Sequence, residues 1–160
     1  MIVIADTTPL NYLVLIEEVG ILPQLYGRVL IPLAVCEELR KPETPGAVRG
    51  WVAQPPAWLE IRPVKQNPDP ALQELGAGER EAIALAEELR ATRLVMDDRA
   101  GRRIATQRHL TVIGTLGVLA EAAERGLIDF SNAITRLKQT SFYVSPEVLN
   151  MLLERYGKDH

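Results

Sequence analysis

This chain lacks the features that mark several large classes of protein. Its 160 residues include a single cysteine, Cys36, which excludes a disulfide framework and a zinc site built from several cysteines. No run of 18 apolar residues is present, so we expect no membrane-spanning helix and no membrane partner. The first residues have no basic cluster and reach an acid at Asp6, so they do not resemble a signal peptide. We therefore expect a cytoplasmic protein.

The chain also lacks an excess of positive charge. Its 18 Lys and Arg residues face 21 Asp and Glu residues, which gives a net charge of −3 at pH 7. This balance argues against a protein that coats nucleic acid through bulk charge, but it leaves room for a local basic rim. Hydrophobic residues make up 47% of the chain, enough to bury a core. With no long linker, residues 1–160 are expected to form one domain.

Short apolar runs alternate with longer helical patterns along the chain. Strands are predicted at 2–5, 28–31, 58–64, 94–96 and 110–113. Helices are predicted from Thr8 onward and at 32–39, 47–53, 79–90, 99–108, 116–125, 132–139 and 147–155. This alternation predicts an α/β protein with a central parallel sheet covered by helices on both faces, a three-layer α/β/α sandwich. Ligands of such sheets bind at the carboxyl ends of the strands.

Acidic residues stand at those strand ends and on the adjacent helix turns. The five acids are Asp6, Glu38, Glu79, Asp97 and Asp98. We expect the sheet to bring them together at one edge, where they would repel one another unless protonated or neutralised by a cation. Because no histidine or cysteine accompanies them, these hard oxygen ligands favour Mg²⁺ or Mn²⁺ over zinc.

Each acid also has an ordinary structural explanation. Asp6 and the Asp97–Asp98 pair are placed to cap the helices that follow them. Glu79 lies in a first helical turn, where an acid complements the helix dipole. What favours a functional interpretation is the joint placement of these acids at one predicted sheet edge.

Four segments in fixed order resemble the PIN-domain ribonucleases, which include the VapC-type toxins. They read DTTPL at 6–10, IPLAVCEEL at 31–39, GEREAI at 78–83 and VMDDR at 95–99. Two further segments, GTLGVL at 114–119 and FYVSPE at 142–147, resemble one uncharacterised prokaryotic clade of that family. The resemblance runs from residue 2 to about 155 and rests on the ordered set. It implies a PIN-like sandwich and a Mg²⁺- or Mn²⁺-dependent endoribonuclease.

The resemblance also implies which acids act. The family's catalytic acids correspond to Asp6, Glu38, Glu79 and Asp98 in this sequence. The expected ligands of one or two metal ions are Asp6, Asp98, Asp97 and Glu79. Two choices stay open, Glu79 against Glu81 and Asp97 against Asp98.

The position of the second acid and one departure from the family pattern also concern this site. The second acid falls on Glu38, which precedes a leucine, and not on Glu37. Met96 stands where the family often has threonine, so a hydroxyl near the site would have to come from Thr7 or Thr115.

The expected reaction is hydrolysis of RNA phosphodiester bonds by metal-activated water. Arg99, Arg102, Arg103 and Arg108 are expected next to the acids, and the first three share a helix face. Nucleic-acid contacts are expected from Thr7, Arg99, Arg102, Arg103 and Thr115. The alternative for the arginines is a solvated helix face paired with acids.

Partners follow from the resemblance alone. It implies an RNA substrate, a toxin role with a cognate antitoxin, and a homodimer. The C-terminal helices, at about 131–156, are expected to pack on the domain or to form the dimer surface. The alternative function is a PIN-fold module that binds nucleic acid or a partner without catalysis, which Met96 and the glutamate at position 79 keep open.

Overall fold

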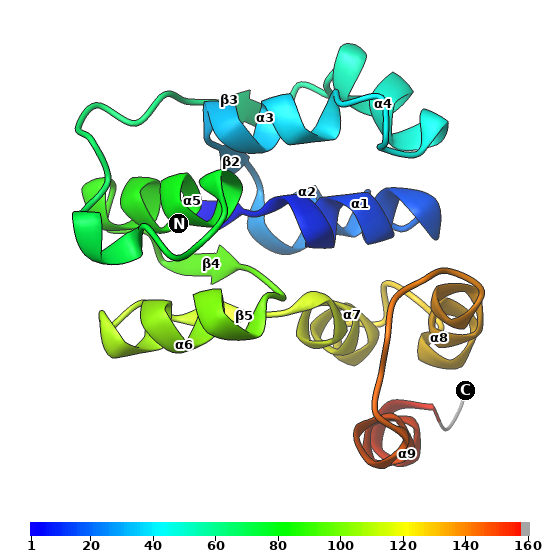
Figure 1. The fold of residues 1–160 in the computed structure, drawn as a ribbon. Coiled ribbons are helices and arrows are strands. Elements are labelled where there is room, and N and C mark those ends of the chain that lie inside the picture. The colour runs from blue at the N-terminus through cyan, green and yellow to red at the C-terminus, as the bar shows by residue number, and fades with distance from the viewer. Residues whose placement is uncertain (158–160) are drawn as a thin grey trace.

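A parallel β-sheet between two layers of helices forms the centre of the molecule (Figure 1). The computed structural model describes residues 1–157. Its strands are β1 (Val3–Ala5), β2 (Val29–Ile31), β3 (Leu59–Ile61), β4 (Arg93–Val95) and β5 (Val112–Ile113). All neighbours pair in parallel, in the order β3-β2-β1-β4-β5. This arrangement confirms the predicted fold class.

The helices match the predicted pattern with small shifts at their ends. They are α1 (Thr7–Leu15), α2 (Ile21–Tyr26), α3 (Leu33–Leu39), α4 (Gly46–Ala53), α5 (Ala77–Glu88), α6 (Arg99–Gln107), α7 (Thr115–Glu124), α8 (Phe130–Lys138) and α9 (Pro146–Tyr156), with a 3-10 turn at Pro70–Leu72. The first helix begins at Thr7, one residue before the predicted start. Helix α2 was not predicted, because it has six residues and carries Pro23 in its first turn.

Side chains of the strands alternate between two hydrophobic clusters, one on each face of the sheet. In β1, Val3 and Ala5 join the larger cluster, which α1, α2, α4, α7 and α8 also fill. Ile4 joins the smaller cluster, formed with α5 and α6. The sheet is therefore buried on both sides, and each fully buried Ile or Leu stabilises the fold by roughly 1.5–3 kcal/mol. This two-sided burial explains why the strands are uninterrupted apolar runs.

The strand order reverses at the centre of the sheet. From β1 the chain winds outward through β2 to β3, then returns to add β4 and β5 on the other side of β1. In Figure 1 the strand labels follow one another from top to bottom as β3, β2, β4 and β5. At such a reversal the connecting segments leave the neighbouring strands in opposite directions, and a crevice opens at their carboxyl ends. The Asp6 N–H donates to Val95 O at 2.9 Å, so Asp6 lies beside the end of β4.

Helices α8 and α9 lie together beside α7 (Figure 1). On α9, Leu149 is buried, and Leu152 and Leu153 are partly buried against the larger cluster. Val148 and Met151 of the same helix are exposed. No helix within residues 1–157 combines the length and apolarity needed to cross a lipid bilayer.

Candidate functional site

The five acids predicted from the sequence meet at the carboxyl edge of the sheet, around the strand-order reversal. They reach that edge from four segments: Asp6 follows β1, Asp97 and Asp98 follow β4, Glu38 lies on α3, and Glu79 lies in the first turn of α5. The charges of Glu79, Glu38 and Asp97 all act on Asp6. The charges of Asp98 and Glu38 act on Glu79. The five carboxylates therefore form one electrostatic group.

Asp6 is the most deeply buried of these acids. Its side chain is 1% exposed, and its Oδ1 atom has no hydrogen-bond partner within residues 1–157. Burial raises the pKa of Asp6 to about 8, and the charges of Glu79, Glu38 and Asp97 add to the effect. Asp6 occupies the position before α1, but its side chain does not cap that helix. A buried polar atom without a partner is costly, so the capping explanation does not account for this residue.

Helices α3 and α5 cap each other through two glutamates. Glu38 of α3 accepts the Gly78 N–H of α5 at 3.0 Å and also the Thr7 hydroxyl. Glu81 of α5 accepts the Ala34 N–H of α3 at 3.1 Å. Neither helix has a side-chain cap of its own at the preceding residue, so each borrows an acid from the other. Glu38 thus faces the acid group, while Glu81 turns to the start of α3.

Glu79, the competitor of Glu81, lies within the acid group. Its carboxylate accepts the Gly76 N–H at 2.9 Å. Burial raises the pKa of Glu79, and the nearby charges of Asp98 and Glu38 raise it further. Glu37, in contrast with Glu38, is exposed to solvent. The structure thus places Glu79 and Glu38 among the acids.

The two aspartates after β4 have different surroundings. Asp97 accepts the Thr115 N–H at 2.8 Å and the Thr115 hydroxyl at 2.5 Å. Burial raises the pKa of Asp97, and the Thr115 hydrogen bonds and the Arg102 charge partly offset that rise. Asp98 is exposed and caps α6 by accepting the Gly101 N–H at 2.8 Å. Asp98 therefore serves as a cap in addition to facing Glu79.

Threonines supply the hydroxyls of this site. Thr115 is fully buried and holds Asp97, and Thr7 holds Glu38. Met96 is fully buried in the smaller cluster, so its side chain serves the core. The structure thus gives both threonines a positioning contact with an acid.

Three glycines that were not singled out from the sequence make room for side chains at the site. A Cβ at Gly78 would lie 2.6 Å from Glu38 Oε1, and a Cβ at Gly114 would lie 2.8 Å from Asp97 Oδ1. A Cβ at Gly101 would lie 2.7 Å from Met96 Sδ, so Gly101 makes room for a core side chain beside Asp98. The sequence feature that could have identified Gly78 and Gly101 is their position in the first turn of a helix beside an acid. For Gly114 it is the position in the turn that closes the last strand.

The acid group has little positive charge to balance it. Among residues 1–157 none of the five acids forms an ion pair with a basic side chain. Within the same range, no three Asp, Glu, His or Cys side chains stand in an arrangement that would hold a metal ion directly. Glu38, Glu79, Asp97 and Asp98 are each held by a local N–H or hydroxyl donor, and the Thr7 N–H lowers the pKa of Asp6 but leaves its Oδ1 atom without a partner within residues 1–157.

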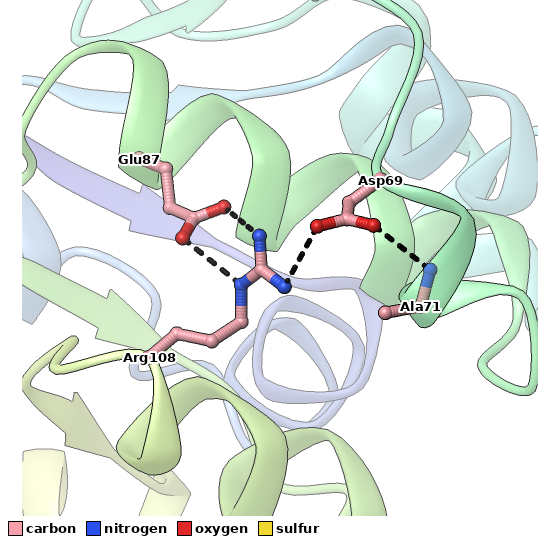
Figure 2. Close-up of polar contacts among 4 residues, drawn as sticks. All are labelled: Asp69, Ala71, Glu87 and Arg108. Atoms are coloured by element: carbon pink, nitrogen blue, oxygen red, sulfur yellow. Dashed lines mark hydrogen bonds and ion pairs between the residues drawn. The ribbon is translucent and has the colours of Figure 1, made fainter.

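The arginines of α6 divide into two groups. Arg102 is half-buried beside Asp97, and Arg99 and Arg103 are exposed near the same end of the helix. Arg108, which the sequence analysis placed with them, lies at the other end of α6 and bonds Glu87 and Asp69 (Figure 2). That part of the prediction was wrong, because Arg108 follows the last turn of the helix and is carried away from the site.

Comparison with known proteins agrees with this geometry. The family profile described as PIN domain (DUF3368) matches residues 2–158. The chain belongs to the PIN-domain family. PIN domains are generally nucleases, typically use divalent metal ions, and are associated with nucleic-acid binding. The predicted family resemblance is thereby confirmed.

One solved PIN-domain relative shows the same fold. It is a PilT N-terminus domain protein, SSO1118, from the hyperthermophilic archaeon Sulfolobus solfataricus P2. The two chains are 20% identical, and the match covers 76% of this chain and 93% of the other with a TM-score of 0.57. No functionally curated protein matches the chain.

Proposed function

We propose that this PIN domain is a metal-dependent endoribonuclease. The observation that carries the proposal is the buried Asp6 carboxyl, with an unpartnered oxygen, inside a group of acids that form no ion pair within residues 1–157. Such a group is expensive to fold unless a cation resides there, and strongly perturbed acids in a crevice are typical of catalytic sites. The strand-order reversal is also where ligands of this sheet type bind.

The donor chemistry of the acid group fits a hard divalent cation. All candidate donors are carboxylate oxygens, and Asp6 Oδ1 has no competing partner. We propose that Asp6 and Asp98, with Asp97 and Glu79, would hold one or two Mg²⁺ or Mn²⁺ ions partly through water, because no three of these side chains within residues 1–157 are arranged to bind an ion directly. When bound, such an ion supplies positive charge that activates water and stabilises the charge developing on the phosphate.

The protein side chains have separate tasks in this proposal. We assign the proton of the attacking water to Glu38, which Thr7 and Gly78 hold, or to Glu79. Thr115 fixes Asp97 so that its carboxylate does not have to reorganise during the reaction. Arg99 and Arg102 offer positive charge to the phosphates of an RNA strand.

The biological setting is part of the proposal. We propose that the protein is the toxin of a toxin–antitoxin pair, acts in the cytoplasm and forms a homodimer. The support is the ordered resemblance to VapC-type toxins. The competing function, a PIN-fold module that binds without cutting, makes a different prediction about cations, because it needs none for binding.

The deciding experiment measures cleavage of a structured RNA with Mn²⁺, with Mg²⁺ and with a chelator. The wild type should cut only with a cation, and Asp6→Asn/Asp98→Asn should lose at least ~100-fold in rate, since loss of even an outer partner of a metal ligand costs 10–100-fold. Asp129→Asn is the matched control, because Asp129 caps α8 away from the site and asparagine is an equally good cap. Equal cutting by the wild type and the double variant would contradict the proposal.

A further inference from the structure

A groove of about 450 Å³ opens beside the acid group. Its volume falls within the range of about 300–1,000 Å³ that is usual for ligand pockets. The walls come from the start of α6, from β5, from the start of α7 and from residues 142–148. Asp97 lines the groove and its charge also acts on Asp6, so the groove borders the acid group at Asp97.

The groove combines cationic and apolar walls. Arg99 and Arg102 line the part next to Asp97, and Arg99 makes no ion pair within residues 1–157. Ile113, Leu116 and Val148 form part of the apolar wall. This pairing of positive charge with apolar surface is unusual for a chain whose net charge is −3.

An exposed aromatic ring stands at the edge of this groove. Tyr143 is 80% exposed, the highest exposure of any large hydrophobic side chain within residues 1–157. Its neighbour Phe142 is anchored edge-on against Tyr12, with the ring centroids 5.0 Å apart. The anchor fixes the backbone beside Tyr143 while leaving the Tyr143 ring open to solvent.

We propose that this groove binds the nucleotide next to the scissile phosphate, with Tyr143 stacking on its base and Arg99 and Arg102 contacting its phosphates. The proposal rests on the proposed function and adds a specificity-determining site to it. An aromatic face beside guanidinium groups is the chemistry that single-stranded nucleic acid recognises, because bases stack and phosphates pair with arginine. An apolar helix from a partner would leave the Arg99 charge without a counterpart.

The proposal gives residues 142–147 a role in selecting the RNA sequence that is cut. The acid group uses none of them, although the sequence marks them as a segment of one PIN-domain clade. Because a base stacked on Tyr143 would fix the register of the strand at the acids, this segment would select which phosphodiester is cut. Base preference next to the cut is therefore the property that Tyr143 should control.

The first test measures binding of fluorescein-labelled single-stranded RNA decamers of A, C or U by fluorescence anisotropy, in chelator so that no cutting occurs. Tyr143→Ala should weaken binding by roughly 5- to 100-fold, the effect of losing one stacked base, and Tyr143→Phe should retain it. Arg99→Ala should make the log–log salt dependence shallower by about 0.7. The control variants Met151→Ala and Arg125→Ala, both exposed and outside the groove, should bind like the wild type.

The second test separates this proposal from the proposed function. Mapping of cut sites should show that Tyr143→Ala changes the base preference beside the cut while cleavage still needs a cation. If the wild type cuts with a cation and Tyr143→Ala binds and cuts identically, the nuclease stands and the groove proposal is overturned. If the wild type neither binds nor cuts RNA, both are overturned. If Tyr143→Ala breaks a dimer in sedimentation and leaves RNA binding unchanged, the groove belongs to a second copy and the proposal is overturned.

Discussion

Helices α5 and α6 pack together, and the two ends of this pair treat acidic side chains in opposite ways. At the carboxyl edge of the sheet, Glu79 and Asp98 face each other, and neither forms an ion pair within residues 1–157. At the other end, Arg108 donates to both oxygens of Glu87, at 2.9 and 2.8 Å, and to Asp69 at 3.3 Å (Figure 2). One end of the pair neutralises its acids and the other does not.

The pKa values follow this difference. Burial and then the charges of Asp98 and Glu38 raise the pKa of Glu79, while the Ala71 N–H and then Arg108 lower the pKa of Asp69. Stability alone would favour a basic partner at both ends, because an ionised acid is best held by donors or by opposite charge. The repulsion at the carboxyl edge is therefore better explained by a ligand than by folding.

Removing the charge of Asp6 should produce the largest change in stability. Because the pKa of Asp6 is raised to about 8 from 3.8, the folded state keeps a proton that the unfolded state releases. Wild-type stability should then fall as pH rises between these values, by up to ~1.4 kcal/mol per pH unit, and be level outside them. Asp6→Asn cannot ionise, so in chelator it should be more stable than the wild type by a few kcal/mol at pH 7.

Denaturant unfolding at pH 4, 6, 7 and 8 checks this prediction. The gain should shrink to below about 1 kcal/mol at pH 4, because that pH lies close to the unfolded-state pKa of 3.8. Asp129→Asn, which changes an exposed cap, should show no such gain at any pH. Parallel pH profiles for the wild type and Asp6→Asn would mean that folding does not raise the pKa of Asp6.

A divalent cation should stabilise the acid end of the helix pair and not the arginine end. At a concentration of 100 Kd, Mg²⁺ or Mn²⁺ should add about 2.7 kcal/mol to the wild type, because it binds the folded state alone. The gain should be absent in Asp6→Asn and present in Arg108→Met. Thermal unfolding with MgCl₂, and with NaCl at matched ionic strength, measures it. An equal gain in Asp6→Asn would place the cation elsewhere.

Thr115→Val should have the next largest effect. It removes a fully buried hydroxyl donor and leaves one Asp97 oxygen unsatisfied, which should cost about 1–3 kcal/mol. Cleavage should fall as well, while Thr115→Ser should restore both. Thr135→Val is the matched control, because the Thr135 hydroxyl bonds only to Ser131 O of its own exposed helix face. A fully stable and active Thr115→Val would show that this hydroxyl does not position Asp97.

Much of the fold was predictable because the strands are buried on both faces. That burial requires uninterrupted apolar runs such as residues 2–5 and 94–96, which stand out in a sequence. Strand ends were harder to place, since β5 is two residues long where four were predicted. A strand end depends on which backbone groups find a partner, and the sequence of one strand does not contain its partner.

The acids of the site were predictable from their positions after strands, but their contacts were not. The mutual capping of α3 and α5 joins Glu38 to Gly78, which is 40 positions away in the sequence. It also joins Glu81 to Ala34, which is 47 positions away. It depends on how the two helices pack, which no local pattern encodes. Arg108 shows the same limit, because α6 has nine residues and spans about 13 Å at 1.5 Å per residue. Arg99 and Arg108 are close in the sequence, but the length of α6 separates them in space.

Arg108→Met should have the smallest effect of these changes. The Arg108 side chain is 25% exposed and that of Glu87 is 35% exposed, so water screens the pair and its loss should cost about 1 kcal/mol or less. The cost should shrink at 1 M NaCl, where the Debye length is about 3 Å. Arg103→Met, on the same helix and without an ion pair within residues 1–157, is the control for lost surface charge. Denaturant unfolding of both variants at low and high salt provides the measurement.

Cleavage by Arg108→Met should equal that of the wild type, because this end of the helix pair holds acids in place without presenting them to a substrate. A large loss of cleavage in a folded Arg108→Met would show that the two ends are coupled, and that their difference in charge is not a division between stability and function.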